Sequence, residues 1–178
     1  IRRTARTAAS ATARTEAARA NAVRDYLLGI FKAAQAQLPE GQRPTPQQLV
    51  QAAAARLDAS SELDDATRAA LHIAYADISS TMSAHADAER AYARAADLLQ
   101  TQPTQRRDWL ATSLRRAYSL SNAGHNAEAI ALAEPLMTEL RTVADARSVA
   151  GLGDWVDILM SAGRFDEAIA NADELARR

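Results

Sequence analysis

The sequence predicts an all-helical protein, and three observations lead to that prediction. First, 44 of the 178 residues are Ala, the residue with the highest intrinsic helix propensity. Second, only six Gly and five Pro are present, and no β-branched run is bounded by turn residues, so a sheet is not expected. Third, the later part of the chain repeats its pattern about every 40 residues, as stacked helical hairpins do.

Residues 3–37 read as one long helix, and we assign 1–38 to this first element. Its first half is rich in Ala and Arg and has no large apolar side chain between Arg2 and Ala22. Beyond that point, large apolar residues recur at the spacing of one helical face: Val23, Leu27, Ile30 and Phe31.

Residues 39–61 read as a loop and a helix that complete an N-terminal hairpin. The loop runs from Pro39 to Pro44. Thr45 then predicts an N-cap, with Pro46 at the first helical position and Gln48 at the capping-box position. The helix is expected from residue 46 to about residue 60.

Residues 62–178 are predicted to form about three repeats, each with a helix, a tight turn and a second helix. The turns fall at Ser83, Gly124 and Gly163, and an Ala follows each turn residue by five positions. A small side chain at that position lets the two helices of a hairpin touch. The residues expected to pack on the first helices are Leu71, Tyr75 and Ile78, then Leu114, Ala117 and Leu120, then Leu152, Trp155 and Leu159. On the second helices they are Ala88, Tyr92 and Ala95, then Ala129, Ala133 and Leu136, then Ala168, Ala172 and Leu175.

Two of these segments resemble the turn and second-helix start of tetratricopeptide repeats. Residues 122–130 read NAGHNAEAI, and residues 161–169 read SAGRFDEAI. In that family a turn Gly is followed five residues later by a packing Ala, usually as Glu-Ala, as in both segments. Ala88-Glu89 matches more loosely, and the period exceeds the usual repeat of about 34 residues. The resemblance covers about 66–178 and implies an extended stack of helical hairpins that binds a protein or peptide.

Residues 14–60 resemble the segment that follows the membrane span in large bacterial serine/threonine kinases with C-terminal tetratricopeptide repeats. Residues 16–31 read EAARANAVRDYLLGIF. In that family an Arg-, Ala- and Glu-rich helix runs into a Val-Arg-Asp-Phe-Leu pattern, and Tyr26 stands here where Phe is usual. A Pro-containing loop and a Thr…Leu-Leu helix follow, matched here by Thr45 and by residues 49–50. The resemblance implies a kinase domain and a membrane span upstream.

No catalytic, cofactor-binding or metal-binding constellation is visible, so we expect no enzymatic activity, no cofactor and no metal in this part of the chain. The absence of Cys excludes disulfides and zinc–thiolate sites. His72, His85 and His125 lack the spacing that suits a metal ion, and surface or packing roles are expected. Residues 151–154 lack the strand, third Gly and Lys of a phosphate loop, and we expect a helix start or a bend there. Pro135 is expected to kink or end its helix.

The charge of the chain disfavours nucleic acid as a partner, because the net charge is -1 and the pI is about 6.4. The six Arg within residues 1–25 suit either a juxtamembrane segment or a solvated helix. Basic residues beside a span usually mark its cytoplasmic side, whereas an N-terminal kinase with one span places this region outside. We give the order of the domains more weight than the position of the basic residues. The expected location is the periplasmic face of the inner membrane, with the cytoplasm as the alternative.

The tetratricopeptide resemblance also implies which residues bind the partner, because in that family the first helix of each hairpin lines the groove. The groove residues that it implies here are Asp77, Thr81, Tyr118, Asn122, Asp157 and Met160, with Ile73, Ser80, Leu114, Ser121, Gly153 and Ser161 beside them. This surface is mixed and mildly acidic, with Tyr118 as an aromatic anchor. The alternative for each of them is packing against a neighbouring hairpin.

Together the resemblances imply an interaction or sensor domain of a bacterial membrane-bound serine/threonine kinase. It is expected to bind a protein or peptide in its groove and to form a homodimer through the long N-terminal helix. The alternative is a cytoplasmic tetratricopeptide adaptor or regulator arm that is not attached to a kinase. An all-helical enzyme would need convergent acid–base or metal-binding groups in a closed pocket, and the sequence offers none.

Overall fold

The computed structural model describes residues 29–30, 32, 36, 38, 42–58, 63–142 and 146–177. Within these residues the chain is helical and contains no strand, which confirms the all-helical prediction. The chain divides into two compact units, Ile1–Asp64 and Asp65–Arg178, and each is described by itself. None of the helices in the described part of the chain is long and apolar enough to cross a membrane.

In the first unit, helix α2 spans Pro46–Asp58. Its start has the predicted capping box. The N–H of Thr45 donates to Gln48 Oε1 (2.9 Å), and the N–H of Gln48 donates to Thr45 Oγ1 (3.2 Å). This reciprocal pair satisfies two backbone donors at the helix start. The long helix expected over 1–38 lies almost wholly outside the described residues.

The second unit contains seven α-helices and two short 3-10 segments within its described residues. The α-helices are α3 (Asp65–Thr81), α4 (His85–Gln100), α5 (Arg106–Asn122), α6 (Asn126–Ala133), α7 (Met137–Thr142), α8 (Ala146–Ser161) and α9 (Phe165–Ala176). The 3-10 segments are η1 (Pro103–Gln105), before α5, and η2 (Glu134–Leu136), between α6 and α7.

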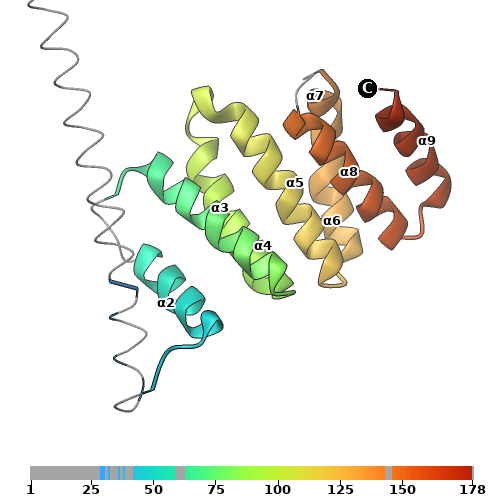
Figure 1. The fold of residues 1–178 in the computed structure, drawn as a ribbon. Coiled ribbons are helices and arrows are strands. Elements are labelled where there is room, and N and C mark those ends of the chain that lie inside the picture. The colour runs from blue at the N-terminus through green and yellow to red at the C-terminus, as the bar shows by residue number, and fades with distance from the viewer. Residues whose placement is uncertain are drawn as a thin grey trace, which may run out of the picture. The chain divides into compact units, whose positions relative to one another are not determined.

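These helices pack as three hairpins, α3–α4, α5–α6 and α8–α9, and each hairpin contacts the next. Helix α4 packs on α5, and α8 packs on both α5 and α6. Figure 1 shows α3, α5 and α8 on the near side of this unit, with α4 and α6 behind them. The first helices of the three hairpins therefore lie on one side of the unit.

The three hairpin turns share one backbone geometry at the positions predicted from the sequence. Ser83, Gly124 and Gly163 all have positive φ, at 59°, 90° and 75°. At each turn, the N–H of this residue donates to the carbonyl three residues earlier, and the next N–H donates to the carbonyl five residues before itself. These six bonds measure 2.9–3.1 Å and form a Schellman motif at each helix end. The predicted turn positions are confirmed.

The alanines that follow these turns lie at the helix crossings and are buried, as predicted. Ala88, Ala129 and Ala168 each retain at most 1% of their surface. Ala76 on α3 and Ala117 on α5 pack into the same clusters and are also fully buried. Small side chains at these positions let the two helices of a hairpin approach closely.

The packing face of α3 differs from the prediction by about one residue. Ile78, which we expected to pack, is 49% exposed. The buried positions of α3 include His72, Ala76 and Ser79 instead. Since α4 crosses α3 at short range, the crossing face takes small or polar side chains and the bulky Ile78 turns outward. Tyr75 is partly buried and packs against the cluster that contains Ala76 and Ala88, so the pattern of large apolar residues is wrong at Ile78 and holds at Tyr75.

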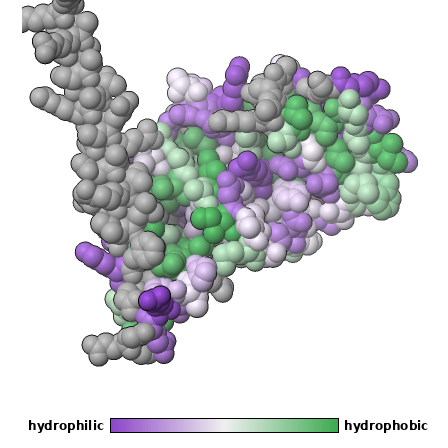
Figure 2. Space-filling model, viewed as in Figure 1, coloured by the Kyte–Doolittle hydropathy of each residue, from purple (hydrophilic) through white to green (hydrophobic). Residues whose placement is uncertain are grey.

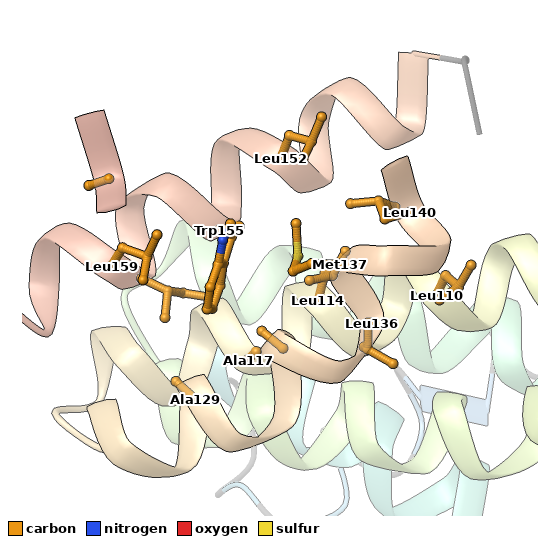
Figure 3. Packing of buried hydrophobic residues seen from close by; sticks show 13 residues of the cluster. Leu110, Leu114, Ala117, Ala129, Leu136, Met137, Leu140, Leu152, Trp155 and Leu159 are labelled. Atoms are coloured by element: carbon orange, nitrogen blue, oxygen red, sulfur yellow. The ribbon is translucent and has the colours of Figure 1, made fainter. Parts of the chain in front are cut away.

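An apolar cluster joins the second and third hairpins. Trp155 on α8 is 3% exposed, and Figure 3 shows its indole pointing from α8 toward Ala117 on α5. Met137 and Leu140 from α7 complete the cluster beside Leu152. Removing a buried aromatic side chain of this size costs roughly 3–5 kcal/mol, so this cluster is a major source of stability for the unit.

Pro135 and Gly151 lie in the segments that surround this cluster. Pro135 lies in η2, where a 3-10 segment interrupts the α-helical chain, so the predicted break is confirmed. Gly151 lies inside α8, which begins at Ala146, so a helix start at Gly151 is wrong. A Cβ on Gly151 would come within 2.9 Å of Leu114 Cδ1 and 3.2 Å of Leu140 Cδ2. Glycine is therefore used here because α8 lies very close to α5 and α7.

The turn geometry gives a prediction for glycine substitutions. Gly124→Ala and Gly163→Ala each lower the free energy of unfolding by about 1 kcal/mol, because an L side chain is strained at positive φ. A Cβ at either position meets no atom within 4 Å, so crowding does not contribute. Urea denaturation measures the change.

Gly153→Ala is the matched control. Gly153 lies inside α8 with no atom within 4 Å of an added Cβ, so Ala there raises the free energy of unfolding by up to about 1 kcal/mol. Equal effects of the same sign at Gly124 and Gly153 would contradict the role given to the turn conformation.

Candidate functional site

The side formed by α3, α5 and α8 contains a pocket of about 320 Å³. We call this side of the second unit the shared face. The pocket is lined by Ile73 on α3, by Asp108, Ala111, Thr112 and Arg115 on α5, and by Ala150, Gly151 and Asp154 on α8. Figure 2 shows this side with hydrophilic side chains gathered over the middle of the unit and hydrophobic ones on both sides of them, toward α3 and toward α9.

A polar network connects the first hairpin to the second on the shared face. Arg115 on α5 donates through Nη1 to both carboxylate oxygens of Asp77 on α3, at 3.0 and 3.3 Å. The hydroxyl of Tyr92 on α4 donates to Asp77 Oδ1 at 2.5 Å. Burial and the hydrogen bond to Asp77 raise the pKa of Tyr92, so it stays a donor at physiological pH. Asp77 is thus held by two neighbouring helices.

Asp154 has the most perturbed carboxyl group on this face. Its pKa is raised to about 6, chiefly by burial and in smaller part by the negative charge of Asp157, while the positive charge of Arg115 opposes the rise. Arg115 forms its ion pair with Asp77 and not with Asp154. A carboxyl with this pKa, located in a cavity, is a candidate functional group.

The six groove residues implied by the sequence lie on the three first helices, in pairs at three- or four-residue spacing. Asp77, Thr81, Asn122, Asp157 and Met160 are exposed, and Tyr118 is half-buried. Two of them make local bonds: the Thr81 hydroxyl donates to the carbonyl of Asp77 (2.9 Å), and the Asn122 amide donates to the carbonyl of Tyr118 (3.1 Å).

The alternative of packing applies to Leu114 and Ser121, which are buried, to Tyr118, and in part to Asp77. Tyr118 packs against the apolar cluster between the second and third hairpins. Asp77 serves the network with Arg115 and Tyr92. Asp157 and Met160, by contrast, have side chains that lie mainly in solvent, and Met160 is 47% exposed.

Sequence reasoning did not find the polar residues of the pocket. Asp108, Arg115 and Asp154 line it, and only Ile73 among the implied groove residues does so. Arg115 and Asp154 each lie three residues before an implied position, Tyr118 and Asp157. Extending the same helical face by one turn toward the start of each helix would have found them.

The histidines lie apart from the pocket lining. His72 is buried in α3, and His125 lies in the second turn, where its Nδ1 is 3.4 Å from Glu128 Oε1. Among the residues that the structure describes, no three His, Asp or Glu side chains are grouped so as to hold a metal ion.

Comparison of the chain with protein-family models, with curated proteins and with solved structures finds no match. The chemistry of the shared face is therefore the basis for a function. Among its described residues, that face offers carboxylates, the paired guanidinium group of Arg115, and exposed apolar and polar side chains. These groups suit noncovalent binding.

The electrostatics around Asp154 give a second prediction. Arg115→Gln raises the pKa of Asp154 above about 6, and Asp157→Asn lowers it, because each removes one of the charges that act on this carboxyl. Carboxyl carbon NMR shifts followed over pH 3–9 measure both changes.

Arg116→Gln is the matched control, because Arg116 donates to Glu89 Oε1 (2.8 Å) on α4 and does not act on Asp154. If the pKa of Asp154 shifts equally in the Arg115 and Arg116 variants, the assignment of Arg115 as its neighbouring charge is wrong.

Proposed function

We propose that residues 62–178 form a tetratricopeptide-like repeat region that binds a segment of a protein partner along the shared face. The same turn geometry and the same buried alanine recur in the three hairpins, at intervals of 41 and 39 residues between Ser83, Gly124 and Gly163. Recurrence of this kind is typical of repeat proteins, in which each unit contacts mainly its neighbours.

The observation that carries the proposal is that first helices from three hairpins contribute to one pocket and one face. A partner segment that crosses α3, α5 and α8 would contact all three helices at once. The helices are held by buried cores on their other side, so the surface is preformed and binding requires little ordering of the backbone.

The context that we propose for this region is a bacterial membrane-bound serine/threonine kinase, in which the region acts as an extracytoplasmic interaction or sensor domain. The support is the resemblance of residues 14–60 to the segment after the span in such kinases. Helix α2 begins at Pro46 with its capping box, at the place where that family has its Thr…Leu-Leu helix. Homodimerisation through residues 1–38 would couple binding to the kinase.

A cytoplasmic adaptor or regulator arm without a kinase is the alternative context, and the same binding face would serve it. The two contexts differ in what the gene encodes upstream. A kinase context requires serine/threonine kinase motifs and an apolar span of roughly 20 residues there. If the upstream coding sequence contains neither, the adaptor context replaces the kinase context, and the proposed binding face is unaffected.

The binding proposal predicts that Asp157→Ala and Met160→Ala each weaken partner capture about tenfold, which is the effect of losing one good interface contact. Partners are captured with residues 40–178 as bait, and the affinity of each identified partner is then measured by titration. Both side chains are exposed, so circular dichroism is expected to show unchanged helicity. Tyr118→Ala also weakens capture, but it needs a stability measurement because Tyr118 packs on the core.

Asp166→Ala and Phe165→Ala are the matched controls. Both residues are exposed on α9, which is not one of the three helices that form the shared face, and both variants are expected to capture partners as the unmodified chain does. Loss of capture in these controls together with full capture by the Asp157 and Met160 variants would place the binding surface elsewhere and refute the proposal.

A further inference from the structure

The pocket on the shared face has the size for one side chain of a partner. Its volume of about 320 Å³ is at the lower end of the range for small-molecule sites. Small residues create the space, namely Ala111 on α5 with Ala150 and Gly151 on α8. Gly151 lies directly against Leu114 and Leu140 of the core, so one wall of the pocket is fixed by tight packing.

The charges of the pocket favour a cationic occupant. The charged groups among the described residues of the lining are Arg115, Asp154 and Asp108, and Asp108 has an interaction partner of its own. Arg115 is bonded through Nη1 to Asp77, which balances its charge. Asp154 is half-buried, and no hydrogen bond to it contributes to its electrostatics. Its ionised form therefore has no hydrogen-bond donor of its own, and the charge that favours this form is that of Arg115.

We propose that this pocket receives a basic side chain of the bound partner, with its cationic group against Asp154 and its aliphatic stem along Ile73, Ala111 and Ala150. This inference rests on the proposed function, because the pocket belongs to the shared face. Lysine and arginine bury their methylene stems on apolar surface while the charged group reaches an acceptor. A charge-assisted hydrogen bond to a carboxylate is about twice as strong as a neutral one.

The pKa of Asp154 determines how the binding of a cation at this position depends on pH. Burial, aided by Asp157 and opposed by Arg115, raises the pKa of Asp154 to about 6. A cation binds the ionised carboxylate, so its affinity is full above this pKa and is lost as the pH falls through it. About a tenth of Asp154 is ionised at pH 5 and about nine tenths at pH 7, so binding is about tenfold weaker at pH 5.

The test uses the isotope-labelled chain and Nα-acetyl-arginine amide as the probe, followed by NMR at low ionic strength. Nα-acetyl-citrulline amide is the neutral analogue of nearly the same shape. We expect saturable shifts of the Ala150, Gly151 and Asp154 amides with the arginine probe, about tenfold weaker binding at pH 5 than at pH 7, and no saturable shifts with the citrulline probe. The pKa of Asp154 falls when the arginine probe is bound.

Two variants separate charge from shape. Asp154→Asn removes the carboxylate and lowers probe affinity at least tenfold while abolishing its dependence on pH. It also removes a buried charge, so it is expected to fold and to be more stable at pH 7. Ala150→Leu fills the pocket and weakens binding with the carboxylate intact. Asp97→Asn, at an exposed position on α4, is the matched control and binds as the unmodified chain does.

The inference is overturned if the citrulline probe binds as tightly as the arginine probe, or if Asp154→Asn keeps both affinity and pH dependence. Because the small probe needs no protein partner, its binding tests the pocket independently of the proposed function. Specific arginine binding with unaffected partner capture in the Asp157 and Met160 variants would refute the binding face. Reduced capture in those variants, without saturable arginine binding, would refute the pocket alone.

Discussion

Close approach of paired helices is the constraint on which the rest of the second unit depends. Ala88, Ala129 and Ala168 leave only a methyl group at each crossing, and a left-handed residue five positions earlier turns the chain back at the right distance. A larger side chain at a crossing would force the helices apart, typically at a cost of about 1–3 kcal/mol. Each hairpin is fixed in this way. When the three hairpins stack on one another, α3, α5 and α8 come to lie on one side and form the shared face.

Features that depend on residues close in the chain could be predicted from the sequence. The capping box at Thr45, the break at Pro135 and each turn with its following alanine involve residues at most five positions apart. The pocket could not be predicted in the same way, because it joins Arg115 and Asp154, 39 positions apart, and because Gly151 is explained only by leucines from two other helices. The groove positions that the tetratricopeptide resemblance implies lie in the second half of each first helix. They include Tyr118 and Asp157, but they do not include Arg115 and Asp154, the pocket residues one turn earlier.

Asp154 on the shared face lowers the stability of the fold when its carboxyl group is ionised. Its folded-state pKa of about 6 lies above the value of about 4 expected for an unfolded chain. Between these two values the native state holds a proton that the unfolded state releases, so the contribution of this residue to stability falls as the pH rises through that window. A carboxyl that is costly to ionise and lies in a cavity is a candidate functional group.

Contacts in the second unit join helices of the same hairpin or of adjacent hairpins. Little loop-closure entropy is therefore lost before a contact forms, and chains with such local contacts fold in microseconds to milliseconds. A ribosome needs about 2 to 8 s to add another 40 residues at its usual speed. A hairpin thus has time to dock on the hairpins already made before the next one is synthesised, so stacking can follow the order in which the chain emerges.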